Sequence, residues 1–140
     1  MIADHFRDKG IVTVIGPATG GIILSQVTAR LLGVRSIFTE RENGKMTLRR
    51  GFRIEPGEKV LIVEDIVTTG GSIREVVDVV NQAHGDIVGI GLFVDRSGGK
   101  ADYGVDSEKV FPLVHLTVPT YTAEECPPVS YTHLTLPTTP

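Results

Sequence analysis

The stretch "VLIVEDIVTTGGS", residues 60–72, decides the fold class. It begins with four apolar residues, as a buried strand does, and then places Glu64 beside Asp65. Two threonines, two glycines and a serine follow, and glycines let backbone N–H groups turn toward a ligand. Because a helix is expected after this loop, its free N–H groups complete an anion site that suits a phosphate monoester. No Gly-Lys-Ser/Thr ends the loop, so it is not a Walker P-loop.

Strands and helices alternate along the rest of the chain. Apolar, β-branched runs predict strands over 11–16, 34–41, 60–65, 86–95 and 109–118. Helical spacing predicts a short helix within 1–10 and longer helices over 22–33 and 72–85. This alternation predicts an α/β fold in which a central, mostly parallel sheet is flanked by helices.

The two longer helices are predicted to be amphipathic. The first carries Ile23, Val27 and Leu31 on one face, with Gly33 as its C-cap. The second carries its inner face on Ile73, Val76, Val77 and Val80. Residues 42–59 are polar, basic and contain glycine, so they form either a loop or a hairpin with Gly44 in its turn. The sequence leaves both alternatives open.

The composition excludes several classes of protein. The chain has 140 residues, enough for one domain with a core, and its net charge of −3 implies no general attraction to nucleic acid or anionic membranes. One cysteine, Cys126, excludes an internal disulfide framework and suits the cytoplasm. No apolar run approaches the roughly 20 residues that cross a bilayer. The histidines at 5, 84, 115 and 133 show no metal-ligand spacing.

Three polar stretches follow predicted strands, at 16–21 ("GPATGG"), 64–72 ("EDIVTTGGS") and 95–99 ("DRSGG"). Parallel sheets bind ligands beyond the carboxyl ends of their strands, so we expect one site there. Glu64 and Asp65 are acceptors for sugar hydroxyls and attract Mg²⁺ or a developing cation. The alternative for this pair is a solvated strand end. The alternative for 16–21 is a tight strand–helix connection that needs glycine for steric reasons.

The acidic pair followed by Thr-Thr-Gly-Gly-Ser resembles the phosphoribosyl pyrophosphate (PRPP) motif of type I phosphoribosyltransferases. The resemblance implies that fold and places the ribose hydroxyls of PRPP on Glu64 and Asp65. Its phosphate would contact a run of six residues, Val67, Thr68, Thr69, Gly70, Gly71 and Ser72. The 16–21 loop would contact pyrophosphate through Thr19 and Gly20, because the lysine that many members carry there is replaced by glycine.

"ERENGKMTLRRGF" (40–52) and "VDRSGG" (94–99) resemble the members of this family that use orotate. The resemblance implies transfer of phosphoribosyl from PRPP to orotate, giving orotidine 5′-monophosphate and pyrophosphate with Mg²⁺ as cofactor. Lys45, Arg41 and Asp65 would be catalytic, with the first two on a mobile loop that reaches the neighbouring site of a homodimer. Arg96, oriented by or paired with Asp95, and Thr68 would contact orotate, since arginine offers a bidentate fork to a carboxylate.

Two rival functions remain open: transfer to another base such as a purine, and PRPP binding by a regulatory protein without catalysis. The resemblance covers a core domain of residues 1–126. It also implies that an N-terminal hood over the base is missing. Residues 127–140 contain no Asp, Glu, Lys or Arg, and we interpret them as a foreign, disordered tail.

Overall fold

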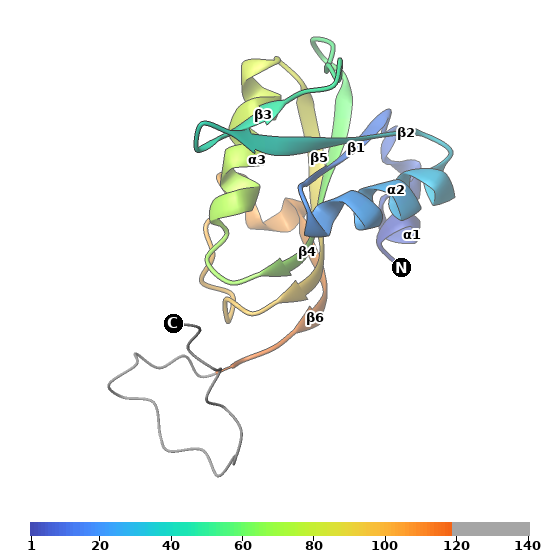
Figure 1. The fold of residues 1–140 in the computed structure, drawn as a ribbon. Helices are drawn as coiled ribbons and strands as arrows, with labels where there is room; N and C mark the ends of the chain where they lie inside the picture. Colours follow the sequence, from blue (N-terminus) through green and yellow to red (C-terminus); the bar gives the residue numbers. More distant parts are fainter. Residues whose placement is uncertain (119–140) are drawn as a thin grey trace, which may run out of the picture.

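A computed structural model describes residues 1–118 and contains one six-stranded sheet (Figure 1). The strands are β1 (Thr13–Pro17), β2 (Arg35–Glu42), β3 (Lys45–Leu48), β4 (Lys59–Val67), β5 (Asp86–Asp95) and β6 (Val110–His115). Their order in the sheet is β3-β2-β1-β4-β5-β6. All neighbours are parallel except β2 and β3, which are antiparallel. The predicted mostly parallel sheet is confirmed.

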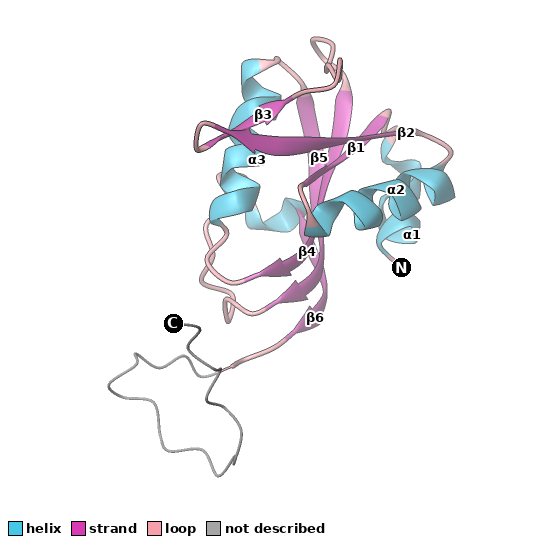
Figure 2. Ribbon diagram, in the orientation of Figure 1, coloured by secondary structure: helices cyan, strands magenta, loops and turns pink. Residues whose placement is uncertain are grey.

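Helices cover both faces of the sheet, as Figure 2 shows. One face carries α1 (Ile2–Phe6), which continues into a 3₁₀ turn at Arg7–Lys9, and α2 (Gly20–Leu32). The other face carries α3 (Gly71–Gln82). A further 3₁₀ turn, Ser107–Lys109, precedes β6. Two apolar cores result, one under α1 and α2 and a larger one under α3.

The predicted apolar face of α2 does not face the core. Ile23, Val27 and Leu31 are 75%, 49% and 59% exposed. The buried positions of α2 are instead small, namely Gly21, Ser25, Thr28 and Ala29. Small side chains let the helix axis approach the sheet closely, so the apolar stripe that periodicity found lies on the exposed side. For α3 the predicted inner face is confirmed, because all four of its residues are buried.

Residues 42–59 begin as a hairpin, which settles one of the open alternatives. β2 and β3 pair around Asn43 and Gly44, which have φ values of 51° and 80°. Asn-Gly is favoured in such two-residue turns because both positions need positive φ. Met46 of β3 is buried in the core under α3. The basic segment is therefore an extension of the sheet that packs against α3.

Some predictions fall outside the described residues. Cys126, His133, the end of the core domain at 126 and the tail over 127–140 all lie beyond residue 118. Within residues 1–118, none of the helices has the length and apolar character needed to span a bilayer.

Candidate active site

Glu64 and Asp65 lie near the end of β4, which runs two residues further than predicted. Glu64 is buried and lines a cavity of about 60 Å³ together with the loop over 66–73. Asp65 lies against Gly20 at the start of α2. Each carboxylate therefore meets a different loop, and β4 brings the 16–21 and 66–73 loops to one place.

The Glu64 carboxyl has an unusual proton affinity. Burial, reinforced by the neighbouring Asp65 carboxylate, raises the pKa of Glu64 to about 8. The backbone N–H of Asp65 donates a hydrogen bond to Glu64 Oε1 at 3.2 Å, which partly opposes this shift. The raised pKa of Glu64 therefore favours the protonated carboxyl, which can both donate and accept a hydrogen bond.

The loop after β4 has the geometry of an anion site. Gly70 is the N-cap of α3 with a φ of 84°, a value that L side chains rarely adopt. The side chains of Thr68, Thr69 and Ser72 are exposed around the cavity that Glu64 lines. Because α3 begins at Gly71, its first N–H groups have no helical acceptor. The structure thus brings together the predicted phosphate residues at a helix start.

The loop over 16–21 joins β1 to α2 through a cis peptide bond between Ala18 and Thr19. A Cβ atom on Gly16 would overlap the carbonyl of Gly21, so the steric alternative explains these two glycines. Gly20 is different, because a Cβ there would overlap the Asp65 carboxylate. Thr19 is exposed at the N-cap of α2. Thr19 and Gly20 therefore lie beside the acidic pair.

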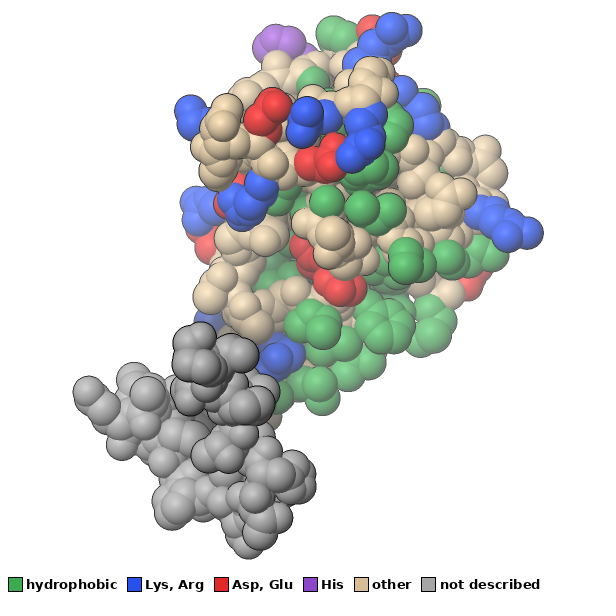
Figure 3. Space-filling model, viewed as in Figure 1, with side chains coloured by type: hydrophobic (Ala, Val, Ile, Leu, Met, Phe, Trp, Pro, Cys, Tyr) green, Lys and Arg blue, Asp and Glu red, His purple; other side chains and the backbone are tan. Residues whose placement is uncertain are grey.

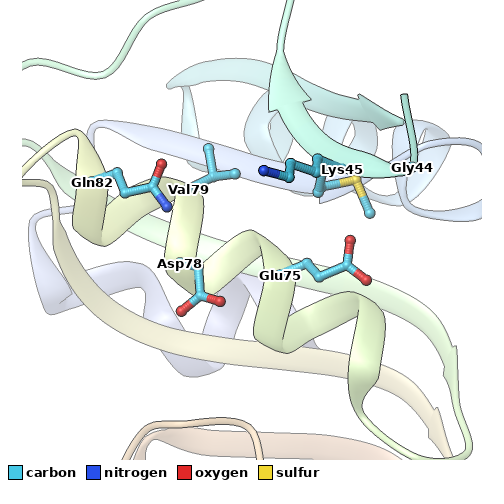
Figure 4. Close-up of a pocket in the computed structure, with 7 residues that line it drawn as sticks. Gly44, Lys45, Glu75, Asp78, Val79 and Gln82 are labelled. Carbon is cyan, nitrogen blue, oxygen red and sulfur yellow. The ribbon is translucent and has the colours of Figure 1, made fainter. Parts of the chain in front are cut away.

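The hairpin cations lie away from this loop. Arg41 donates to Glu75 of α3 at 2.7 Å, and Lys45 lies in a groove of about 380 Å³ over α3 (Figure 4). Figure 4 shows Lys45 extended above the helix near Val79 and Gln82. In the part of Figure 3 that shows the hairpin, Lys and Arg side chains alternate with Asp and Glu. The structure therefore does not bring Lys45 or Arg41 to the cavity of Glu64.

Two further hairpin arginines are also paired. Arg49 lies 3.4 Å from Glu42, and Arg50 donates to Glu40 at 2.8 Å. Within residues 1–118, Lys45 is in no ion pair. Lys45 is thus the hairpin cation whose charge is least compensated by a nearby carboxylate.

Arg96 follows β5 and is exposed in a cavity of about 630 Å³. Thr68 and Thr69 line the same cavity, so the stretches that the sequence assigns to the base and to the phosphate lie next to each other there. Lys100 also lines it and was missed by sequence reasoning. The signal for Lys100 was a second cation in the same glycine-containing loop after a strand.

Asp95 does not pair with Arg96, which corrects one expectation. Its Oδ1 accepts the backbone N–H of Ser97 at 2.8 Å, and its Oδ2 lies 3.5 Å from His115 Nδ1. Arg96 instead donates its backbone N–H to the carbonyl of Val67 at 2.8 Å. Within residues 1–118 the Arg96 guanidinium therefore has no contact with Asp95, and Arg96 is an exposed residue of the cavity that it lines.

Comparison with known families agrees with this arrangement. The phosphoribosyl transferase domain matches residues 1–111. The chain belongs to this family. Curated relatives named orotate phosphoribosyltransferase include those of Desulforamulus reducens, 56% identical, and Thermotoga maritima, 54% identical, each over 126 residues and 90% of this chain. The matched region is 64% and 66% of the length of these two relatives.

Solved structures of phosphoribosyltransferases share the fold. The adenine phosphoribosyltransferase of Rhodothermus marinus matches with a TM-score of 0.70 at 23% identity, over 82% of this chain and 75% of that one. The enzyme of the same name from Thermoanaerobacter pseudethanolicus matches with a TM-score of 0.70 at 17% identity, over 83% and 76%. At this identity the likeness concerns the fold, which for this phosphoribosyltransferase domain is the predicted one.

Metal-binding side chains do not gather into a cluster in the described part of the phosphoribosyltransferase domain. No cluster of three or more His, Cys, Asp or Glu residues with metal-site geometry occurs within residues 1–118. Two hard oxygen donors, Glu64 and Asp65, stand next to the phosphate loop. His5 stacks on Phe111 with ring centroids 3.8 Å apart, which is a packing role.

Proposed function

We propose that this domain transfers phosphoribosyl from PRPP to orotate, giving orotidine 5′-monophosphate and pyrophosphate for pyrimidine synthesis. One observation carries the proposal: Arg96 and Thr68 line one cavity at the carboxyl end of the sheet, directly beside the phosphate loop. The relatives above are named for this reaction, and the chain spans about two thirds of their length. A planar arginine fork suits a base that bears a carboxylate.

PRPP would span the loop over 16–21 and the loop over 66–73, which meet at the end of β4. The 5′-phosphate would accept hydrogen bonds from the loop over 67–72, where free N–H groups and three hydroxyl side chains converge. The ribose hydroxyls would lie at Glu64 and Asp65. Pyrophosphate would lie at Thr19 and Gly20, because Gly20 touches the Asp65 carboxylate. Asp65 would stabilise positive charge that develops on the ribose ring.

The hairpin would act on a neighbouring subunit. Arg41 and Lys45 line neither the Glu64 cavity nor the Arg96 cavity of their own chain, and cations that neutralise a leaving pyrophosphate must approach it closely. A homodimer would deliver them in trans. The exposed stripe of Ile23, Val27 and Leu31 on α2 is the apolar surface that we assign to this contact. The cytoplasm, where PRPP and orotate occur, is the proposed location.

Mg²⁺ fits the donor set but has few protein ligands there. Asp65 offers carboxylate oxygens, which Mg²⁺ prefers, Glu64 would do so after losing its proton, and the phosphates of PRPP would supply others. When bound, Mg²⁺ neutralises charge on the pyrophosphate that leaves. The residues of this chain bind the ribose, orient it and keep Asp65 against Gly20.

The experiment is a turnover assay with PRPP, Mg²⁺ and one base at a time. With orotate, we expect loss of orotate absorbance and one equivalent of orotidine 5′-monophosphate by chromatography. Consumption of adenine or hypoxanthine in place of orotate would favour the purine alternative. PRPP binding without consumption of any base would favour the regulatory alternative.

Substrate binding provides a second readout for the base. Arg96→Ala is expected to weaken orotate binding more than PRPP binding, because the guanidinium meets the base and not the phosphate. Arg53→Ala is the matched control, since Arg53 is exposed and paired with Glu55 away from the site. Equal loss of both affinities in Arg96→Ala would contradict the role of Arg96.

A further inference from the structure

The loop that carries Arg96 returns to the phosphate loop and packs on its glycine. A Cβ atom on Gly70 would lie 3.2 Å from Ala101 Cβ, 3.3 Å from the Asp102 carbonyl oxygen and 3.3 Å from Tyr103 Cε1. Gly70 is the N-cap of α3 and is itself buried. The segment Ala101–Tyr103 therefore forms the wall behind the start of α3.

An ion pair links the same segment to the first turn of α3. Arg74 donates to Asp102 at 2.9 Å, and the other Asp102 oxygen accepts the backbone N–H of Gly104 at 2.9 Å. The backbone N–H of Gly104 and then the Arg74 guanidinium lower the pKa of Asp102, so the carboxylate is charged at neutral pH. Both side chains are exposed, and such pairs contribute little to stability. Their value here is geometric, because they fix Asp102 over the helix start.

Tyr103 anchors the segment in the core. Its side chain is 8% exposed and belongs to the apolar cluster that contains Ile73 and Val77 of α3. Its hydroxyl is buried and makes no hydrogen bond of normal geometry within residues 1–118, although the Ser97 side chain lies close enough to oppose the rise in the pKa of Tyr103. Burial, together with the negative charge of Asp95, raises the pKa of Tyr103, so the phenol stays protonated. The ring is therefore the part of Tyr103 that supports the loop.

The start of the same loop is tied to the phosphate loop as well. Arg96 donates its backbone N–H to Val67, the last residue of β4. Buried Asp95 accepts from Ser97, which holds the first turn after Arg96. The loop over 96–104 is thus attached to the phosphate loop at Val67 and again at Gly70.

We propose that Tyr103 and Asp102 are positioning residues for the phosphate of the ribosyl substrate. They hold Gly70 and the start of α3 in the conformation that presents the loop N–H groups to a phosphate monoester. The inference rests on the proposed function for the identity of that ligand. Since the same loop carries Arg96, a carboxylate-bearing base and a ribose phosphate should bind with positive coupling.

Ribose 5-phosphate, titrated by calorimetry, tests the positioning role without any turnover. Tyr103→Ala removes the ring behind Gly70, and we expect its affinity to fall about tenfold or more, because small displacements of a binding group are costly. Tyr103→Phe keeps the ring and loses a hydroxyl that makes no hydrogen bond of normal geometry within residues 1–118, so its affinity should stay within about twofold. Unchanged affinity in a folded Tyr103→Ala would overturn the role of Tyr103.

Arg74 and Asp102 are both exposed, so variants at these two positions should fold without disturbing the core. Asp102→Ala and Arg74→Ala should each weaken ribose 5-phosphate binding about two- to fivefold, and the double variant no more than either single one. Arg53→Ala, which breaks an exposed pair elsewhere, should bind as wild type does. Additive losses, or none, would overturn the role of Asp102. Failure of the wild type to bind ribose 5-phosphate would overturn the phosphate site itself, and the inference with it.

The coupling between the binding of orotate and of ribose 5-phosphate is measured by repeating the ribose 5-phosphate titration with saturating orotate. Wild type should bind ribose 5-phosphate more tightly with orotate present, and Asp102→Ala should lose most of that gain. Equal gains in both proteins would contradict transmission through this loop.

Discussion

The phosphate loop and the basic hairpin differ in how their functional groups are held. In the loop over 67–72 the groups are mostly backbone N–H atoms, fixed by the end of β4, the start of α3 and the wall at Ala101–Tyr103. In the hairpin they are long cationic side chains, and Arg41 is already paired with Glu75. The proposed phosphate site is built from backbone groups of one chain, whereas the proposed role of the hairpin cations depends on the position of the hairpin relative to a neighbouring subunit.

The largest effect is expected at the point where the two strand-end loops meet. Asp65→Asn removes the charge that lies against Gly20, and we expect kcat/KM for orotidine 5′-monophosphate formation to fall about 10²–10³-fold. Steady-state kinetics would measure it. Asp86→Asn, at the exposed start of β5, is the control and should keep wild-type rates. A loss below tenfold would break the assignment of Asp65 to the reacting ribose.

The hairpin should show a different kinetic signature. Lys45→Ala is expected to lower kcat about 10–10²-fold while the PRPP affinity measured by calorimetry changes little, because the cation acts on the leaving pyrophosphate. Mixing the Lys45→Ala and Asp65→Asn proteins tests whether Lys45 acts on the site of the partner subunit. A heterodimer of the two variants should have one intact site, with Asp65 from one chain and Lys45 from the other. If the mixture is only as active as the two variants measured separately and added, action of Lys45 on the partner is contradicted.

The next largest effect is expected on the pH dependence of stability, through the ionisation of Glu64. The folded pKa is about 8 against an ordinary value of 4.5, so the folded protein binds the proton more tightly than the unfolded chain. Stability contributed by the protonated carboxyl is full below pH 4.5 and is lost as pH rises through 8. Glu64→Gln should therefore be closer to wild type in melting temperature at pH 5 and more stable than wild type at pH 9. The same melting-temperature difference at both pH values would contradict the raised pKa.

The smallest effect concerns the exposed face of α2. Ile23→Ser and Leu31→Ser should change the free energy of unfolding of the monomer by less than about 0.5 kcal/mol, since these side chains already lie in solvent. Sedimentation should nonetheless show weaker self-association than for wild type. Ala29→Ser, on the buried side, is the contrasting variant and should lower the melting temperature. Unaltered self-association in both exposed variants would remove α2 from the proposed dimer contact.

The sequence predicts the region around the glycine-rich loop better than it predicts the contacts of the hairpin. The strand over 60–67, the glycine-rich loop and the buried face of α3 are local patterns, and the structure has them nearly where the sequence placed them. The side of α2 that faces the core could not be read from its apolar stripe, because its fully buried positions are small residues. The Arg41–Glu75 pair and the contact of Tyr103 with Gly70 join residues more than 30 positions apart, and no local pattern encodes them.

The most direct test of the account is an amide chemical-shift titration of the isotope-labelled protein with ribose 5-phosphate. The account predicts the largest shifts at the backbone N–H groups of 68–72, with smaller shifts at Gly70's neighbours Ala101–Tyr103 and none at the hairpin turn. Largest shifts at Gly44, Lys45 and the facing side of α3, with residues 68–72 unmoved, would contradict it.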